Sequence, residues 1–198
     1  MYELLKRYLG LNIPVDEKKL NEIAGYFKPL TANKNAILLS HGEVCNNFYF
    51  VNKGCVRTYY LTEQGTEKTR YIAMEGIVIT SLSSFISQQP SFELIEVLES
   101  TELLAISRNS FFRMVENIPE WEQFYRKLLE YAYLFQNKKI EQLVTLTAGE
   151  RYAALMMENP HFVLRLSNKI LASYLDLTPE TLSRIKSAGL KGGVNSLN

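Results

Sequence analysis

The sequence predicts an α+β protein, with an antiparallel β-roll first, then one long helix, then a compact helical segment. Between residues 36 and 107, apolar residues alternate with a period of two, in short runs separated by turn residues. From residue 110 onward the apolar period becomes helical. With 198 residues, 46% of them hydrophobic, the chain is long enough to bury a core without disulfides.

The N-terminal part is expected to begin with helices and to continue as strands. Residues 1–30 carry apolar residues at helical spacing in two runs, with Pro14 between them. Strands are expected within residues 49–51, 56–60, 69–73, 95–97 and 103–106, with turns at 52–54, 63–65, 75–76 and 89–91. Short strands at these intervals indicate an antiparallel roll or barrel.

The second half is expected to contain a short helix and then a long one. Asn109 or Ser110 can cap the short helix, which runs to Asn117. The long helix covers 119–146, and its apolar residues extend nearly all round it. Such a helix must be covered on more than one side. One face would pack on the roll and a second copy would cover the other, which predicts a homodimer; burial between two parts of one chain is the alternative.

Composition excludes several classes of protein. The net charge is +1, so no overall basic field indicates a nucleic-acid partner. The only histidines, His41 and His161, lie too far apart in sequence for a short metal-binding motif, and no nucleophile or cofactor motif occurs. We therefore expect no catalytic residue, no metal and no cofactor. Apolar runs are too short to cross a bilayer and the N-terminus lacks a signal peptide, so a cytoplasmic protein is expected.

The sharpest motif lies between residues 166 and 190, where two short helices flank a tight turn. Ser167 can cap the first helix, over 168–175, and Thr178 can cap the second. Asp176 stands in the turn, where it can adopt a left-handed conformation. The second helix is expected to close at 188–189. Together these signals predict a helix-turn-helix.

The outward face of the second helix carries side chains that suit DNA. Arg184 can donate two hydrogen bonds to a guanine edge, and Glu180 can accept from a cytosine amino group. A helical hairpin without any nucleic-acid role is the alternative. The residues expected to contact DNA are Lys169, Thr178, Glu180, Thr181, Ser183, Arg184 and Lys186.

On these features the chain resembles the cyclic-AMP receptor protein / fumarate-nitrate regulator (CRP/FNR) family of bacterial transcription factors. The resemblance covers nearly the whole chain, and the stretch around ASYLDLTPETLSRI is most similar to the Bacteroidetes branch. It implies a cyclic-nucleotide-binding-like jelly roll at 1–118, a dimerisation helix and hinge at 119–146 and a DNA-binding domain at 147–198.

The resemblance also implies function. A homodimer would bind double-stranded DNA at a palindromic operator and contact RNA polymerase. Glu180 and Arg184 match the family's base-reading positions, whereas Pro179 stands where the family has another arginine. The family usually ends in a small β-wing, and none is expected after residues 192–193.

The effector site implied by the resemblance is altered. Cyclic-nucleotide binders hold the phosphate with an arginine and the ribose with a glutamate. Here Ser91 and Ser81 stand at those positions, and Glu93, if it pointed inward, would repel a phosphate. No response to cyclic AMP is therefore expected.

A pocket for an unknown small molecule is still expected between the roll and the long helix. Arg70 could pair an anionic ligand there, or it could be a solvated strand residue. The candidate lining residues are Tyr59, Arg70, Thr80, Ser81, Ser91, Gln136 and Asn137. The reading favoured by the sequence is a DNA-binding transcriptional regulator; a ligand-binding regulator that acts through protein contacts, without DNA, is the alternative.

Overall fold

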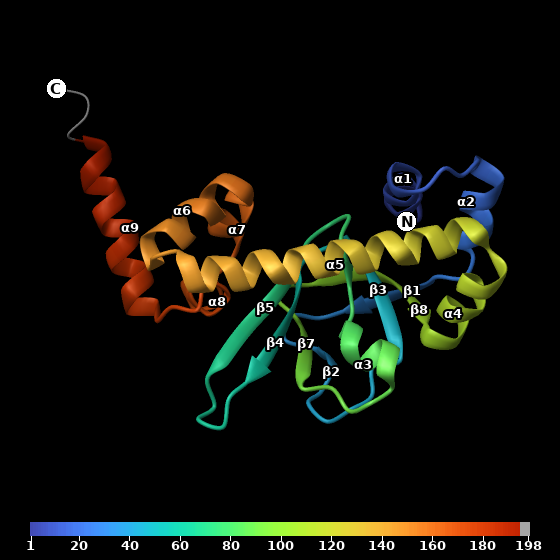
Figure 1. Cartoon of the computed structure of the whole chain (residues 1–198), viewed down its shortest axis with the longest axis horizontal. Helices are drawn as coiled ribbons and strands as arrows, with labels where there is room; N and C mark the ends of the chain where they lie inside the picture. Colours follow the sequence, from blue (N-terminus) through green and yellow to red (C-terminus); the bar gives the residue numbers. More distant parts are fainter. Residues whose placement is uncertain (195–198) are drawn as a thin grey trace.

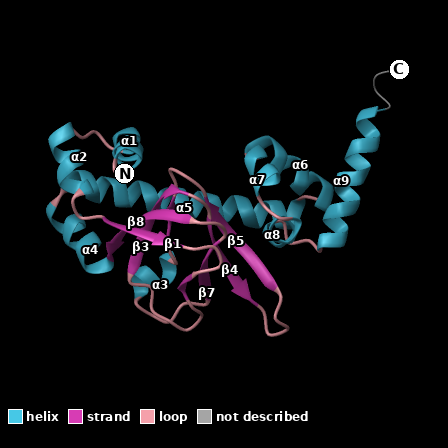
Figure 2. Ribbon diagram, turned by 180° about the vertical axis from the view of Figure 1, so that it is seen from behind, coloured by secondary structure: helices cyan, strands magenta, loops and turns pink. Residues whose placement is uncertain are grey.

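Two antiparallel sheets form the roll in the computed structural model, which describes residues 1–194 and the side chains of residues 1–188 (Figure 1; Figure 2). The two four-stranded sheets have the strand orders β1-β8-β3-β6 and β2-β7-β4-β5. The strands are β1 (Lys28–Ala32), β2 (Ile37–Leu39), β3 (Asn47–Lys53), β4 (Val56–Leu61), β5 (Glu67–Ala73), β6 (Val78–Ile79), β7 (Glu93–Val97) and β8 (Thr101–Ser107).

Helices precede, interrupt and follow the roll. Figure 1 shows α5 running along the molecule, from the roll to the C-terminal helices. The helices are α1 (Glu3–Asn12), α2 (Glu17–Ala24), α3 (Leu82–Ser87), α4 (Arg108–Asn117), α5 (Pro119–Thr145), α6 (Ala148–Glu158), α7 (Pro160–Arg165), α8 (Asn168–Tyr174) and α9 (Pro179–Val194). The α+β class, the roll, the long helix and the C-terminal helix pair are thereby confirmed.

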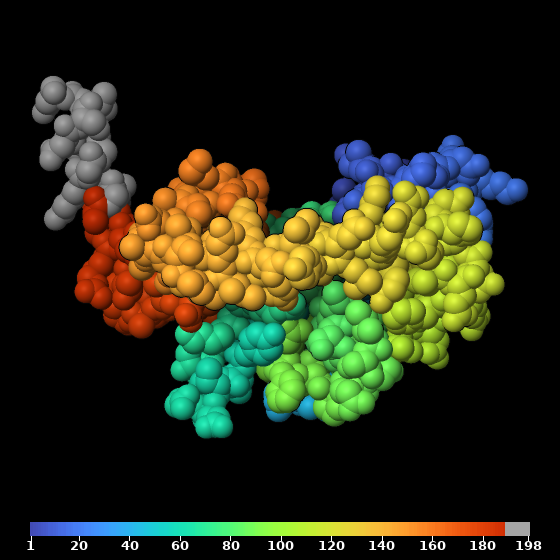
Figure 3. Space-filling view, viewed as in Figure 1, coloured from blue at the N-terminus to red at the C-terminus, as the bar shows by residue number. Residues whose placement is uncertain are grey.

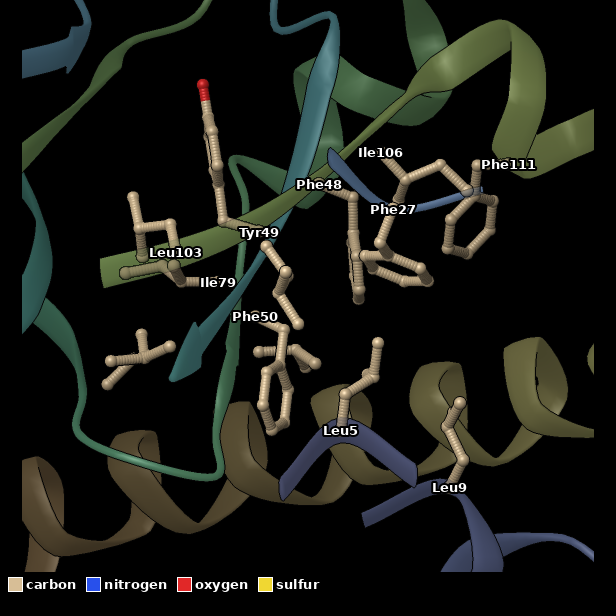
Figure 4. Packing of buried hydrophobic residues seen from close by; sticks show 14 of the residues in the cluster. Leu5, Leu9, Phe27, Phe48, Tyr49, Phe50, Ile79, Leu103, Ile106 and Phe111 are labelled. Atoms are coloured by element: carbon tan, nitrogen blue, oxygen red, sulfur yellow. The ribbon is translucent and has the colours of Figure 1, made fainter. Parts of the chain in front are cut away.

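An aromatic core joins the roll to the start of α5. Phe48, Phe111 and Trp121 are fully buried. The rings of Phe111 and Trp121 pack edge to face, with their centroids 5.1 Å apart. The Trp121 indole nitrogen also donates a hydrogen bond to the Phe111 carbonyl at 3.2 Å. Figure 4 shows Leu5 and Leu9 of α1 beside this core. Buried aromatic pairs of this kind fix the roll and the first turns of α5 as one unit.

Several local expectations are wrong, for identifiable reasons. The N-terminal helices end at Ala24, because residues 28–32 pair with β8. Ser107, and neither Asn109 nor Ser110, caps α4, since its side chain accepts from the Ser110 amide. The last helix continues through Gly189 to Val194. Glycine weakens a helix by about 1 kcal/mol without breaking it, so residues 188–189 do not close α9. Residues 195–198 of the predicted C-terminal domain lie outside the described residues.

Candidate nucleic-acid interface and interior cavity

Helices α8 and α9 have the caps and turn that the sequence predicts. Ser167 accepts a hydrogen bond from the Ile170 amide at the start of α8. Thr178 accepts one from the Thr181 amide at 3.2 Å at the start of α9. Asp176 has a φ of 55°, the left-handed conformation that the turn needs. Local hydrogen bonding therefore specifies where both helices begin and where the chain turns.

The inner faces of the two helices are fixed by apolar packing. Leu171 and Leu182 are fully buried, and Ala172 is buried where a small side chain lets the helices approach. Leu175 is buried as well, while Leu177 is half-buried. With one side of α9 held in this way, its opposite side is left facing solvent.

Helix α9 and its preceding turn carry six of the seven predicted DNA-contacting residues. Arg184 is exposed, and its Nη2 donates to the Thr181 hydroxyl at 3.3 Å. The backbone amide at the start of α9, then the Thr178 side chain, lower the pKa of Glu180, so this carboxylate is ionised at neutral pH and accepts hydrogen bonds. Thr178, Glu180, Ser183 and Arg184 are exposed, whereas Thr181 and Lys186 are half-buried, and Lys186 Nζ donates to Asn168 Oδ1 of α8 at 2.6 Å.

The seventh residue, Lys169, lies on α8 and faces the roll. Its Nζ pairs with Glu67 of β5 at 2.6 Å. Glu67 is held in turn by the buried guanidinium of Arg57, also at 2.6 Å. The structure thus separates Lys169 from the α9 face and makes it part of the joint between the helix-turn-helix and the roll.

Helix α8 docks on β5 mainly through polar contacts. The Ser173 hydroxyl accepts from the Thr69 amide and donates to the Glu67 carbonyl, both at 2.8 Å. Lys68 forms an ion pair with Asp176 in the turn. A small apolar cluster lies alongside, in which Leu171 of α8 joins buried residues of the roll such as Ile72 and Cys55. The docked face therefore combines a modest apolar patch with several hydrogen bonds.

Arg165, at the end of α7, adds an ionic clasp to the same joint. Its guanidinium pairs with Glu75 at 2.6 Å and also with Glu99. Glu75 accepts a further hydrogen bond from the Gly54 amide at 2.7 Å. The hydrogen bonds from Arg165, and then the one from Gly54, outweigh burial and lower the pKa of Glu75 to about 2. Glu75 and Arg165 are thus both charged at all physiological pH values.

Two cations stabilise the end of α8 that leads into the turn. Lys139 of α5 donates to the Tyr174 carbonyl at 2.9 Å and lies over the Tyr174 ring. Arg151 of α6 donates to the Leu175 carbonyl at 3.1 Å. Burial, and then the charge of Arg151, lower the pKa of Lys139 to about 8. Positive groups at the C-terminal end of a helix satisfy its free carbonyls and favour its dipole.

A cavity of about 810 Å³ opens between the roll, α5 and α8. Arg70, Ser81, Ser91 and Gln136 line it, as the sequence predicts. The structure adds residues that sequence reasoning missed as lining: Glu93 from the roll, Lys139 from α5, and Ser173, Tyr174 and Asp176 from the helix-turn-helix. The cavity therefore touches both the roll and the turn that sets the direction of α9.

Three predicted lining residues lie elsewhere. Successive strand residues point to opposite faces, so Tyr60 lines the cavity while Tyr59 lies beneath the Arg57 guanidinium, 4.1 Å from it. Thr80 donates to the Asn47 carbonyl at 2.9 Å and borders a separate hollow of about 60 Å³.

Asn137 is the third. It follows Gln136 by about 100° of helical turn and is exposed on the outer side of α5. The sequence pattern indicates where these positions lie along the chain but not which face of their strand or helix they occupy.

Inside the cavity the predicted polar residues bind one another. Arg70 Nη1 pairs with the Glu93 carboxylate at 2.8 Å, so Arg70 is not a solvated strand residue. The Ser81 hydroxyl donates to the other Glu93 oxygen at 2.7 Å and lies 2.9 Å from the Ser91 hydroxyl. Glu93 does point inward, which is the condition under which the sequence predicts repulsion of a phosphate.

Two further observations concern the part of the chain that the structure describes. There, no group of three or more His, Cys, Asp or Glu side chains is placed to hold a metal ion. Among the same residues, no helix combines the length and the apolar character needed to cross a membrane.

Comparison with known proteins finds similar chains among regulatory proteins. Residues 29–117 match the cyclic nucleotide-binding domain. An anaerobic regulatory protein of Pasteurella multocida is 24% identical, over 96% of this chain and 73% of its own. The fumarate and nitrate reduction regulatory protein of Yersinia pestis is also 24% identical, over 90% of this chain and 74% of its own.

A solved structure, that of FixK2 from Bradyrhizobium japonicum, has the same fold. Its TM-score is 0.76 at 21% identity, over 84% of this chain and 86% of the other. The likeness therefore covers more residues than the roll and the long helix contain.

Proposed function

We propose that the chain is a transcriptional regulator of the CRP/FNR family and that it binds a specific DNA sequence as a homodimer, without a need for cyclic AMP. In this proposal residues 1–118 form the sensor-like roll, 119–146 join the protomers, and 147–198 bind DNA in the cytoplasm. RNA polymerase is the partner through which such a dimer would act on transcription.

The outer face of α9 is the observation that carries the proposal. Arg184 and Glu180 are exposed, while Leu182 on the inner face is fully buried. A guanidinium and an ionised carboxylate one helical turn apart can address neighbouring base edges in a major groove. The Thr178 and Ser183 hydroxyls flank them and are placed to contact phosphates. The docked roll leaves this face free.

The outer side of α5 supports the dimer. Figure 3 shows α5 lying across one face of the molecule, uncovered by the described chain. Tyr133, Ile140 and Val144 are 67%, 59% and 79% exposed and follow one another along a single stripe of the helix. Asn137 lies in the same stripe, where a polar residue can set the register of two paired helices. A second copy of α5 is the occupant that fits this repeating surface.

The charge of the cavity supports independence from cyclic AMP. A cyclic nucleotide carries one negative charge, and binding it in an interior site requires an available cation. Arg70 is already paired with Glu93, and Lys68 with Asp176. An entering phosphate would also face the Glu93 carboxylate itself. Isothermal titration should therefore detect no cyclic-AMP binding at micromolar concentrations.

Selection of genomic fragments by the purified protein tests the proposed function. We expect the bound fragments to share a palindrome whose half-sites are about 34 Å apart, one turn of DNA. Affinity should fall steeply with added salt, because lysine and arginine contacts release counterions from the phosphates. Failure to retain any fragment over the salt range would refute DNA binding and favour a regulator that acts through protein contacts.

The dimer is tested separately by sedimentation. Val144→Glu places a charge in the exposed stripe of α5, away from the residues that line the cavity, and should convert a dimer into monomers at micromolar concentration. Leu11→Glu on α1 is the matched control, since Leu11 is 80% exposed and lies outside the stripe. A wild-type protein that sediments as a monomer at all concentrations would contradict the proposal.

A further inference from the structure

A buried ion pair at the cavity wall joins strands on either side of β4. Arg70 lies on β5 and Glu93 at the start of β7, and the guanidinium Nη1 is 2.8 Å from the carboxylate. The side chain of Glu93 is only 6% exposed and that of Arg70 23%. A carboxylate buried to this degree is costly unless its partners are in place, so its presence requires an account.

Both oxygens of this carboxylate have partners. One accepts from Arg70, and the other accepts from the Ser81 hydroxyl at 2.7 Å. Ser91 completes the group, because its hydroxyl lies 2.9 Å from that of Ser81 and accepts from the Glu93 amide at 3.0 Å. The carboxylate is thus held by a guanidinium and a hydroxyl, donors that protein sites also use to hold small anions, while Ser91 supports the arrangement through its contacts with Ser81 and the Glu93 backbone. Here the anion belongs to the chain.

The same group reaches the long helix. The side-chain amide of Gln136 lies against the Arg70 guanidinium, and the amide orientation that satisfies both side chains lets the Gln136 oxygen accept from Arg70. Arg70 therefore connects Glu93 and Ser81 in the roll to Gln136 in α5. A charge change at Glu93 would be felt at α5, close to Lys139, which holds the end of α8.

The other cations that line the cavity are engaged as well. Lys68 pairs with Asp176, and Lys139 donates to the Tyr174 carbonyl. An external anion at Arg70 or Lys68 would thus have to break an ion pair. Lys139 has no carboxylate partner among the described residues, but the site around Arg70 already holds an anion, that of Glu93.

We propose that Glu93 is a built-in anion that takes the place of an anionic effector. Its carboxylate supplies the charge that positions Arg70, and through Arg70 and Gln136 it couples the roll to α5 without a ligand. The consequence for DNA binding rests on the proposed function, whereas the consequence for anion binding does not. Removal of the carboxylate should leave Arg70 facing a vacant site that admits a small anion.

The test is chemical rescue of Glu93→Ala. Formate, acetate and inorganic phosphate are titrated at constant ionic strength, balanced with chloride, while the melting temperature is followed. We expect a saturable rise in melting temperature for Glu93→Ala, none for the wild type, and none for Arg70→Met/Glu93→Ala. A folded Glu93→Ala that shows no saturable response, or a wild type that responds equally, would overturn the proposal.

Glu93→Ser keeps the test decisive if the alanine variant does not fold. Its hydroxyl supplies a polar group beside Ser81 while leaving the place of the carboxylate vacant and Arg70 without a counter-charge, so it too should gain a saturable anion response. If neither single variant folds, Arg70→Met/Glu93→Gln, which carries no charge at the site, should fold. If that variant is equally unfolded, the carboxylate is not there to neutralise Arg70 and the proposal is wrong.

DNA binding gives a second, separable readout. Glu93→Ala should bind the selected operator about tenfold more weakly than the wild type, and acetate or formate should restore it. Lack of rescue in a folded variant that does bind these anions would refute the coupling. A wild type that binds no DNA would refute the proposed function and leave the melting experiment to decide the role of Glu93.

Discussion

The roll and the helix-turn-helix are held by different kinds of contact. The roll is packed against α4 and α5 through fully buried aromatic side chains such as Phe111 and Trp121. The joint between the helix-turn-helix and the roll adds ion pairs and hydrogen bonds, among them those of Arg165 and Ser173, to its apolar cluster. Apolar burial is strong and insensitive to salt, whereas partly exposed ion pairs are weak and screened. The fold therefore combines a stable scaffold with a joint that can open at small cost.

Substitution in the scaffold should give the largest effect. Phe111→Ala removes a ring that contacts Phe48 and Trp121, and it should lower the free energy of unfolding by about 3–5 kcal/mol. Urea denaturation measures this loss. Phe92→Ala is the matched control: its ring is 75% exposed, and its removal should change stability by less than about 0.5 kcal/mol. Equal losses for the two variants would abolish the contrast between core and surface.

Substitution in the joint should have a smaller and more local effect. Arg165→Met removes the pairs with Glu75 and Glu99, and it should cost about 1 kcal/mol, mostly as opening of the joint. Hydrogen exchange should accelerate at amides of α8 while those of β3 and β8 stay protected. Lys19→Met is the control, since it removes an exposed pair with Glu22 on α2 at 2.8 Å. Global exchange throughout the roll would show that the joint is not a separate unit.

Acidification should act on the same joint with the smallest effect. Because the folded-state pKa of Glu75 is lowered to about 2 from an ordinary 4.5, the clasp contributes its full stability above pH 4.5. This contribution is lost progressively as the pH falls toward 2. Melting curves of wild type and Glu75→Gln should therefore differ above pH 4.5 and converge below it. A melting-temperature difference that stays constant over this pH range would exclude titration of Glu75 as the cause.

Much of the fold could be predicted because its signals are local. The caps Ser167 and Thr178 and the left-handed Asp176 depend on hydrogen bonds within a few residues, which the sequence displays directly. Strand β1 could not be predicted in this way, since its pairing partner β8 is distant in sequence and most side chains of β1 are exposed. Helices α3 and α7 have only six residues each, too few for a helical period to be recognised.

The site was only partly predictable, for the same reason. The α9 face follows from helical geometry once Leu182 is assigned to the core. The Arg70–Glu93 pair depends on β4 lying between β5 and β7, which no local pattern reveals. Likewise the pairing of Lys169 with Glu67 requires that α8 dock on the roll. Long-range topology, which the sequence pattern leaves open, decides these contacts.

Binding of Arg184 variants to the selected operator tests the central claim most directly. Arg184→Ala should weaken specific binding by about 1–3 kcal/mol and relax the base preference at one position in each half-site. Arg184→Lys should keep non-specific affinity yet lose that preference, because lysine lacks the planar fork that reads guanine. Arg113→Ala, an exposed position on α4, should have no effect. If Arg184→Ala binds the operator as tightly and as selectively as the wild type, α9 is not the recognition helix.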